Sequence, residues 1–225
     1  MTDFTPLIAL IAETDDWLVI NKPAGIGMHT ENDQTGLVVL ASTQFNRPLW
    51  PVHRLDKVTS GLLLLAKNAD AAAELGQMFQ KHHIQKFYLA QSTSKPVKKQ
   101  GWIKGDMAKA RNGSWKLTRS MDNPAITRFL SHYDTQQHQQ RLFLLAPKTG
   151  KTHQLRVALK SIGSPITGDE RYKGAASDRT YLHAASLVFD WKEQHYALCA
   201  APESGNHWGA WPTDWLACPW QHLNV

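Results

Sequence analysis

Several segments of the chain are apolar over the length of a β-strand, and polar turn residues separate them. Residues 61–67, with the sequence GLLLLAK, form a continuous apolar run typical of a strand buried on both faces. Within residues 7–21, two short strands are expected on either side of an Asp15–Asp16 turn, and a Lys-Pro-Ala-Gly loop follows them. Further strands are expected at 86–92, 125–134, 141–150, 180–191 and 195–202.

Helical periodicity is confined to fewer segments. A brief helix is expected near 37–41. Asn68 can cap a longer helix over about 69–82, which places Ala72, Leu75 and Phe79 along one side. Residues 151–163 are typical of a third helix that ends at a glycine, with an apolar face formed by Leu155, Ala158, Leu159 and Ile162. Many strands with few helices predict a mixed, largely antiparallel α+β domain.

Size and composition place the chain among ordinary globular proteins. Its 225 residues suffice for one large domain or two small ones, and no apolar run reaches the length of a membrane span. The apolar start lacks a basic leader, so we interpret it as a strand and not as a signal peptide. Cys199 and Cys218 follow no metal-ligand spacing. We therefore expect a cytoplasmic protein without disulfides.

Positive charge is concentrated in the middle of the chain. The formal net charge is +6, yet residues 51–150 carry sixteen Lys or Arg against six Asp or Glu, whereas residues 1–50 carry two against six. Residues 95–120 are basic and irregular in pattern, as in a hairpin arm or a long loop. The charge distribution alone fits a surface that faces a polyanion and fits a solvated lysine-rich face equally well.

Three motifs contain the residues that are the strongest candidates for a catalytic role. In HRLDKVTSGLLLLAK (53–67), an aspartate stands beside basic residues directly before the buried strand. The others are KFYLA (86–90) and TGKTHQLRVALKSIGSPITGDERY (149–172), with weaker matches at INKPAG, NPAITRF and LHA. Together, in this order over residues 8–202, they resemble the RNA pseudouridine synthases of the RluA type.

This resemblance implies an isomerase that detaches a uracil base from its ribose in RNA, rotates it and rejoins it through carbon 5. The residues that match the family's motif are Asp56 as the catalytic aspartate, Tyr88 as the active-site tyrosine and Arg156 as the arginine that pairs with the aspartate. The implied fold is a curved, mainly antiparallel mixed sheet flanked by helices, with a central RNA-binding cleft. The implied partner is a stem-loop of ribosomal or transfer RNA.

The chemistry of these residue types agrees with the roles. Bond cleavage at the anomeric carbon needs an anionic group, either as a nucleophile or as a stabiliser of positive charge. A guanidinium such as that of Arg156 keeps a partly buried carboxylate ionised and fixes its orientation. Tyr88 offers a flat face for stacking on uracil and a hydroxyl for a polar contact or proton relay. Structural alternatives are a plain Asp56–Arg156 ion pair and a packed core tyrosine.

The target base must leave its stack before its glycosidic bond can be reached. Arg54 is placed to fill the vacated space or to hold a phosphate. RNA-backbone contacts are predicted for His53, Lys57, Lys151 and His153. Lys151 stands where the family usually has arginine, which keeps the charge but loses the planar fork. For His153, as for His183, a hydrogen-bonded structural role is the alternative.

No metal or organic cofactor is expected, since no His or Cys spacing predicts a zinc site and the glycines at 25 and 27 do not complete a dinucleotide motif. Two other functions stay open. One is an RNA-binding or RNA-folding protein on the same scaffold with little activity. The other is a nucleoside or glycoside hydrolase, which would need a second carboxylate, for which Asp106, Asp169 and Glu170 qualify by residue type alone.

The predicted domain division is a catalytic domain over 1–202 and a tryptophan-rich tail over 203–225 packed on it, with no separate N-terminal RNA-binding domain. A monomer is expected. The tail contains Trp208, Trp211, Trp215 and Trp220. Large aromatic side chains are mostly buried, which favours a hydrophobic cap over an RNA-stacking surface.

Overall fold

The computed structural model describes residues 7–32, 34–135 and 140–223. Ten strands of these residues form one sheet, in the order β1-β2-β4-β11-β5-β10-β9-β6, with β3 beside β4 and β12 beside β11. Its strands are β1 Ala9–Glu13, β2 Trp17–Lys22, β3 Trp50–Pro51, β4 Ser60–Ala66, β5 Gln85–Ser92, β6 Gln100–Gly105, β9 Ala125–Tyr133, β10 Arg141–Pro147, β11 Leu182–Trp191 and β12 Gln194–Cys199. The pairing of β4 with β11 is parallel and the other pairings of these described strands are antiparallel. The predicted fold class is confirmed.

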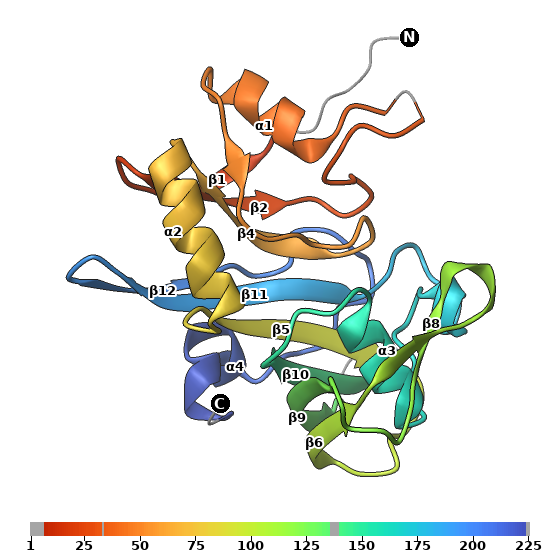
Figure 1. Ribbon diagram of the computed structural model, residues 1–225. Helices are drawn as coiled ribbons and strands as arrows, with labels where there is room; N and C mark the ends of the chain where they lie inside the picture. Colours follow the sequence, from red (N-terminus) through yellow and green to blue (C-terminus); the bar gives the residue numbers. More distant parts are fainter. Residues whose placement is uncertain (1–6, 33, 136–139, 224–225) are drawn as a thin grey trace, which may run out of the picture.

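The helices flank this sheet, as Figure 1 shows. They are α1 Leu37–Gln44, α2 Ala69–Gln80, α3 Gln154–Ser161 and α4 Thr213–Ala217. The Asn68 side chain accepts a hydrogen bond from the Ala71 amide, so the predicted cap of α2 is confirmed. None of the described helices is long and apolar enough to cross a membrane.

Strand β4 is buried along its whole length and supports the loop that precedes it. Leu63 and Leu65 pack in a core with α1 and α3, whereas Leu62 and Leu64 pack in a second core with α2. This alternation follows from the two-residue period of a strand, and it explains why four consecutive leucines are needed. The strand that follows the HRLD segment is therefore rigidly held.

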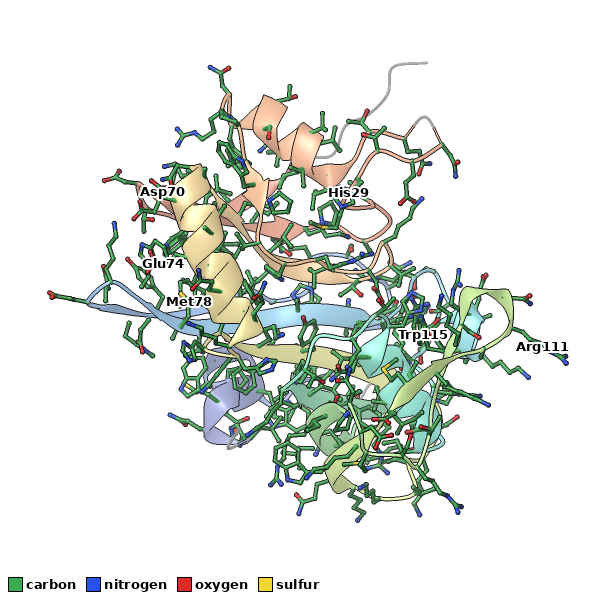
Figure 2. The ribbon with its side chains drawn as sticks, in the orientation of Figure 1. His29, Asp70, Glu74, Met78, Arg111 and Trp115 are labelled. Atoms are coloured by element: carbon green, nitrogen blue, oxygen red, sulfur yellow. The ribbon has the colours of Figure 1, made fainter. Side chains whose placement is uncertain are left out.

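The basic segment over 95–120 divides into two parts. Strand β6 joins the main sheet beside β9, and β7 Met107–Lys109 pairs with β8 Trp115–Leu117 in a separate hairpin. Figure 2 shows Arg111 pointing outward at the tip of this hairpin, while Trp115, which pairs with Lys109 next to the turn, lies on the side toward α3. Of the two predicted forms, the hairpin is the one present.

The tryptophan-rich tail packs against the sheet. Trp215 and Leu223 are buried in a core with Phe87 and Leu144, and Trp208, Trp211 and Trp220 pack against the same core. The hydrophobic-cap interpretation accounts for these contacts. Residues 1–6 and 224–225, the outer ends of the predicted domain and tail, lie outside the described residues.

Candidate active site

The loop that carries Asp56 lies between β3 and β4 and is held by backbone hydrogen bonds. The Thr59 amide donates to the Asp56 carbonyl at 3.0 Å, which closes a turn over residues 56–59. The Gly25 amide donates to the Lys57 carbonyl at 2.8 Å. Leu55 is buried in the main core, whereas the Asp56 side chain is 20% exposed. The loop therefore presents its carboxylate to solvent from a fixed backbone.

A fully buried lysine stabilises this loop from behind. Lys22 Nζ donates to the carbonyls of Pro23 at 2.9 Å, Lys57 at 3.3 Å and Thr59 at 2.8 Å. Three acceptors match the three protons of an ammonium group. Burial lowers the pKa of Lys22 to about 7, with the charge of Arg179 acting in the same direction and that of Asp56 against it. Lys22 lies in the INKPAG motif, but its role behind the loop was not predicted.

Arg156 joins the Asp56 loop to a second carboxylate. Its Nε and Nη2 donate to Asp169 at 2.7 and 2.8 Å, and its Nη1 donates to Asp56 Oδ2 at 3.3 Å. The side chains of Arg156 and Asp169 are 6% and 1% exposed. Burial disfavours the charge of Arg156, but the pairs with Asp169 and Asp56 raise its pKa above the usual value. The guanidinium is thus a permanent cation that orients the Asp56 carboxylate.

The start of α3 aims Arg156 into this position. His153 precedes the helix with φ of 59°, in the left-handed region. Gln154 is buried and its amide accepts from Thr149 Oγ1 and donates to the Ile126 carbonyl and to Thr127 Oγ1. These bonds tie the 149–154 segment to β9, so the T-H-Q part of the motif builds the bend before the helix. Neither Gln154 nor the pairing of Asp169 with Arg156 was predicted, although both residues lie in the quoted motif.

Tyr88 lies on β5 beside the Asp56 loop. It is 8% exposed, and burial followed by the negative charge of Asp56 raises its pKa. The phenol is therefore a neutral hydrogen-bond donor at physiological pH. Tyr88 lines the same pocket as Asp56 and Arg156, so the structure brings the three predicted catalytic residues together.

The predicted RNA-contact residues differ in their exposure and in their hydrogen bonds. Arg54 and Lys57 are exposed on the loop, and Lys151 Nζ donates to Asn123 Oδ1 at 2.5 Å near the pocket rim. His153 Nδ1 pairs with the Tyr172 hydroxyl at 2.8 Å, and burial is the main cause that lowers its pKa. His153 lines the pocket, so the hydrogen bond does not remove it from reach of a ligand.

His53, also predicted to contact the RNA backbone, is held by the fold through one of its ring nitrogens. Its Nε2 accepts a hydrogen bond from the Leu64 amide at 2.9 Å, and its ring stacks on Phe79 with centroids 4.3 Å apart. Burial and the neighbouring charge of Lys86 lower the pKa of His53 to about 3. His53 is therefore a neutral ring that lines the pocket, and its Nδ1–H remains a donor, so a phosphate contact there would be a hydrogen bond and not an ion pair.

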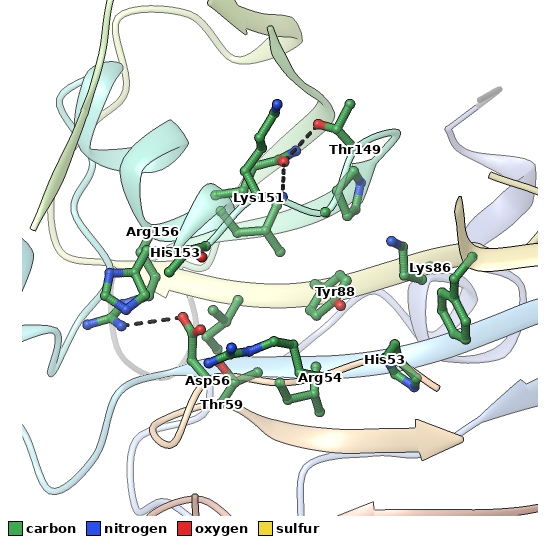
Figure 3. Close-up of a pocket in the computed structure, with 18 of the residues that line it drawn as sticks. His53, Arg54, Asp56, Thr59, Lys86, Tyr88, Thr149, Lys151, His153 and Arg156 are labelled. Atoms are coloured by element: carbon green, nitrogen blue, oxygen red, sulfur yellow. Dashed lines mark hydrogen bonds and ion pairs between the residues drawn. The ribbon is translucent and has the colours of Figure 1, made fainter. Parts of the chain in front are cut away.

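These side chains line a cavity of about 440 Å³, within the size range of ligand pockets. Figure 3 shows Asp56 and Arg156 at one end, Tyr88 in the middle and Lys86 beyond it. Asp56 is the one acid among the described residues that line the cavity, beside four Lys or Arg, namely Arg54, Lys86, Lys151 and Arg156. The described residues hold no cluster of three His, Cys, Asp or Glu that could bind a metal.

Comparison with known protein families agrees with this site, in which one oriented carboxylate lies in a cationic pocket. Residues 16–161 match the family model described as RNA pseudouridylate synthase. The chain belongs to the RNA pseudouridine synthase family. The predicted enzyme class, an isomerase acting on RNA, is thereby confirmed, as is the resemblance to the RluA type.

Individual relatives agree with this family assignment. An uncharacterized RNA pseudouridine synthase of Haemophilus influenzae is 52% identical over 204 residues, covering 89% of this chain and 90% of that protein. A ribosomal large subunit pseudouridine synthase C of Rickettsia bellii is 36% identical over 81% of this chain, and the match spans 64% of the relative's length. The solved structure of human RNA pseudouridylate synthase domain containing 1 covers 96% of both chains with a TM-score of 0.75 at 22% identity, and this likeness supports the fold.

Proposed function

We propose that this pseudouridine synthase converts one or a few specific uridines of ribosomal RNA, transfer RNA or both to pseudouridine, with Asp56 as the essential group. The observation that carries the proposal is the contact between Asp56 and Arg156 at the end of a cationic pocket. A carboxylate that is oriented by a guanidinium and partly exposed suits attack on, or stabilisation of, the carbon that loses the base.

The reaction moves one bond and one proton. The bond between ribose C1′ and uracil N1 breaks, the base rotates, and a bond forms between C1′ and C5. The C5 hydrogen is then lost to solvent and N1 gains a proton. Asp56 serves at C1′ or at the base, and Tyr88, neutral because of its raised pKa, stacks on the ring or donates a proton or hydrogen bond.

Positions around the pocket favour isomerisation over hydrolysis. A glycoside hydrolase would place a second acid near Asp56. Asp169 is committed to Arg156 through two hydrogen bonds, and Asp106 accepts the amides of Asp122 and Asn123. Neither lines the described pocket, and neither does Glu170. Within the part of the chain that the structure describes, no second acid therefore lines the pocket beside Asp56 to activate a water molecule.

Arg54 is the residue we propose to replace or support the flipped base. It is exposed on the Asp56 loop and lines the pocket, and Figure 3 shows its guanidinium end on the Asp56 side of Tyr88. Lys57, Lys151 and His153 would bind the RNA backbone around the entrance. The monomeric state and the cytoplasmic location stay predictions.

The test is tritium release from RNA labelled at C5 of uracil. Ribosomal RNA is the first substrate to try, because a relative is named for the large ribosomal subunit, and transfer RNA is the second. Unmodified preparations of each RNA are incubated with wild type and Asp56→Ala. Release by the wild type alone, from either RNA, supports the proposal and identifies the substrate class. Tight binding without release from both would instead favour an RNA-binding protein.

A further inference from the structure

The pocket continues beyond the predicted catalytic residues. Past Tyr88 it is bounded by Gly76 and Phe79 of α2, by Lys86 of β5 and by Gly150. Figure 3 shows Lys86 on the side of Tyr88 that faces away from Arg156. A single uracil beside Asp56 and Tyr88 leaves this half of the pocket unfilled.

Lys86 places a positive charge there that no acidic side chain of the described residues pairs with. Among the described residues, its Nζ makes no hydrogen bond and no ion pair, and it lies 5.8 Å from the centre of the Phe79 ring. Burial lowers the pKa of Lys86. Lys22, the other buried lysine of the site, is by contrast satisfied by three carbonyls. An unpaired, partly desolvated ammonium facing a pocket is the arrangement expected for an anionic ligand.

Glycines keep the same space open. Gly76 lies inside α2, where glycine costs about 1 kcal/mol relative to alanine. A Cβ at Gly76 would meet no atom within 4 Å, so packing does not require the glycine. A Cβ at Gly150 would lie 3.9 Å from Lys86 Nζ. Proteins tolerate residues that lower local stability at functional sites. Here the glycine in α2 lowers helix stability but leaves the pocket volume free of a side chain.

The spacing along β5 fits two neighbouring units of a polymer. Lys86 and Tyr88 are two residues apart on one strand, so both side chains face the pocket, about 7 Å apart along the strand. A base stacked on Tyr88 would therefore bring the adjoining sugar-phosphate of an extended strand near the ammonium. The stacked rings of Phe79 and His53 form a flat, uncharged wall behind that position.

We propose that this half of the pocket is a subsite for the nucleotide adjacent to the target uridine, with its phosphate bound by Lys86 and its remaining volume over Gly76 and Phe79. The inference rests on the proposed function, since it takes RNA as the ligand. It assigns to the pocket a two-nucleotide length, so the enzyme grips the strand beside the base that it isomerises.

The first test measures the charge contact. A short fluorescent oligouridylate is bound to the wild type, Lys86→Met and Lys81→Met across a potassium chloride series. Lys81 is the matched control, because it is exposed at the end of α2 and does not line the pocket. Loss of one phosphate contact should reduce the slope of log affinity against log salt by about 0.7 in Lys86→Met alone. An unchanged slope, or an equal reduction in both variants, would overturn the subsite.

The second test fills the space without removing charge. Gly76→Leu improves helix propensity, so the thermal midpoint should stay equal or rise. Its affinity for oligouridylate should fall, whereas unaltered affinity would contradict the proposal. Neither binding test needs turnover. Failure of tritium release therefore leaves these outcomes unaffected, and failure of the subsite leaves the proposed isomerisation intact.

Discussion

At the residue scale, the site depends on one guanidinium that serves two carboxylates. Arg156 gives two nitrogens to Asp169 and one to Asp56. The sequence motif predicted that Arg156 and Asp56 would meet. It did not predict the anchoring by Asp169 or the support from Lys22, because both depend on which loops the tertiary fold brings together. Residue type alone placed Asp169 among possible second acids.

Arg156→Lys tests this arrangement. Lysine keeps the charge but lacks the planar fork, so it cannot hold Asp169 through two bonds and reach Asp56 as well. We expect turnover to fall strongly and the free energy of unfolding to fall by roughly 2 kcal/mol, from lost hydrogen bonds to a buried charge. Steady-state tritium release and urea unfolding measure the two effects. Arg47→Lys, at a surface pair with Glu13, is the control, and equal behaviour of both variants would refute the role.

At the element scale, periodicity predicted most of the sheet. The continuous leucine run, the Asn68 cap and the glycine after Ile162 each act through local chemistry, so the corresponding strand and helices were predicted. The start of the third helix was predicted at 151, but α3 begins at Gln154 because His153 adopts a left-handed conformation. Pattern alone left the form of residues 95–120 undecided, since short irregular strands carry weak periodicity. The sequence pattern could not predict the parallel pairing of β4 with β11 either, because this pairing joins segments more than 100 residues apart.

Gly61 shows what that parallel contact demands. Its φ is +113°, and a Cβ there would lie 2.2 Å from the Ala184 carbonyl oxygen and 2.6 Å from its nitrogen. Gly61→Ala should therefore separate β4 from β11 and destabilise the protein by about 3 kcal/mol or more. The control is Gly76→Ala, where space is open and a gain of up to about 1 kcal/mol is expected. Chemical denaturation of both variants decides, and equal stability would contradict the close approach.

At the scale of the whole molecule, the distribution of charge bears on the kind of ligand that the protein binds. The pocket is lined by several Lys and Arg side chains and by few acids, which agrees with a surface that faces a polyanion and not merely with a solvated lysine-rich face.

Behind the Asp56 loop, His183 is fully buried between Ser60 and the Ala200 carbonyl. Because a carbonyl only accepts, His183 Nε2 carries the proton and Nδ1 accepts from Ser60, so the neutral ring is the one that fits.

This buried histidine predicts an acid-sensitive fold. Burial lowers the pKa of His183 to about 4, against an unfolded value near 6.5. Between these values the unfolded chain binds more protons, so stability decreases as pH falls through that window, by roughly 3 kcal/mol from this residue. Urea unfolding at a series of pH values measures the slope. In His183→Asn, less stable at neutral pH, the slope should be shallower by up to one proton, and identical slopes would contradict the prediction.

We propose that the Asp56 carboxylate performs the chemistry while the surrounding cations hold the RNA. Asp56→Asn keeps the shape of the side chain and removes only its charge. The decisive measurement is single-turnover tritium release, together with RNA affinity, for this variant and the wild type. We expect release to fall by several orders of magnitude while affinity stays within about tenfold, because phosphate contacts dominate binding. Retained release in Asp56→Asn, with its fold intact, would refute the catalytic role of Asp56.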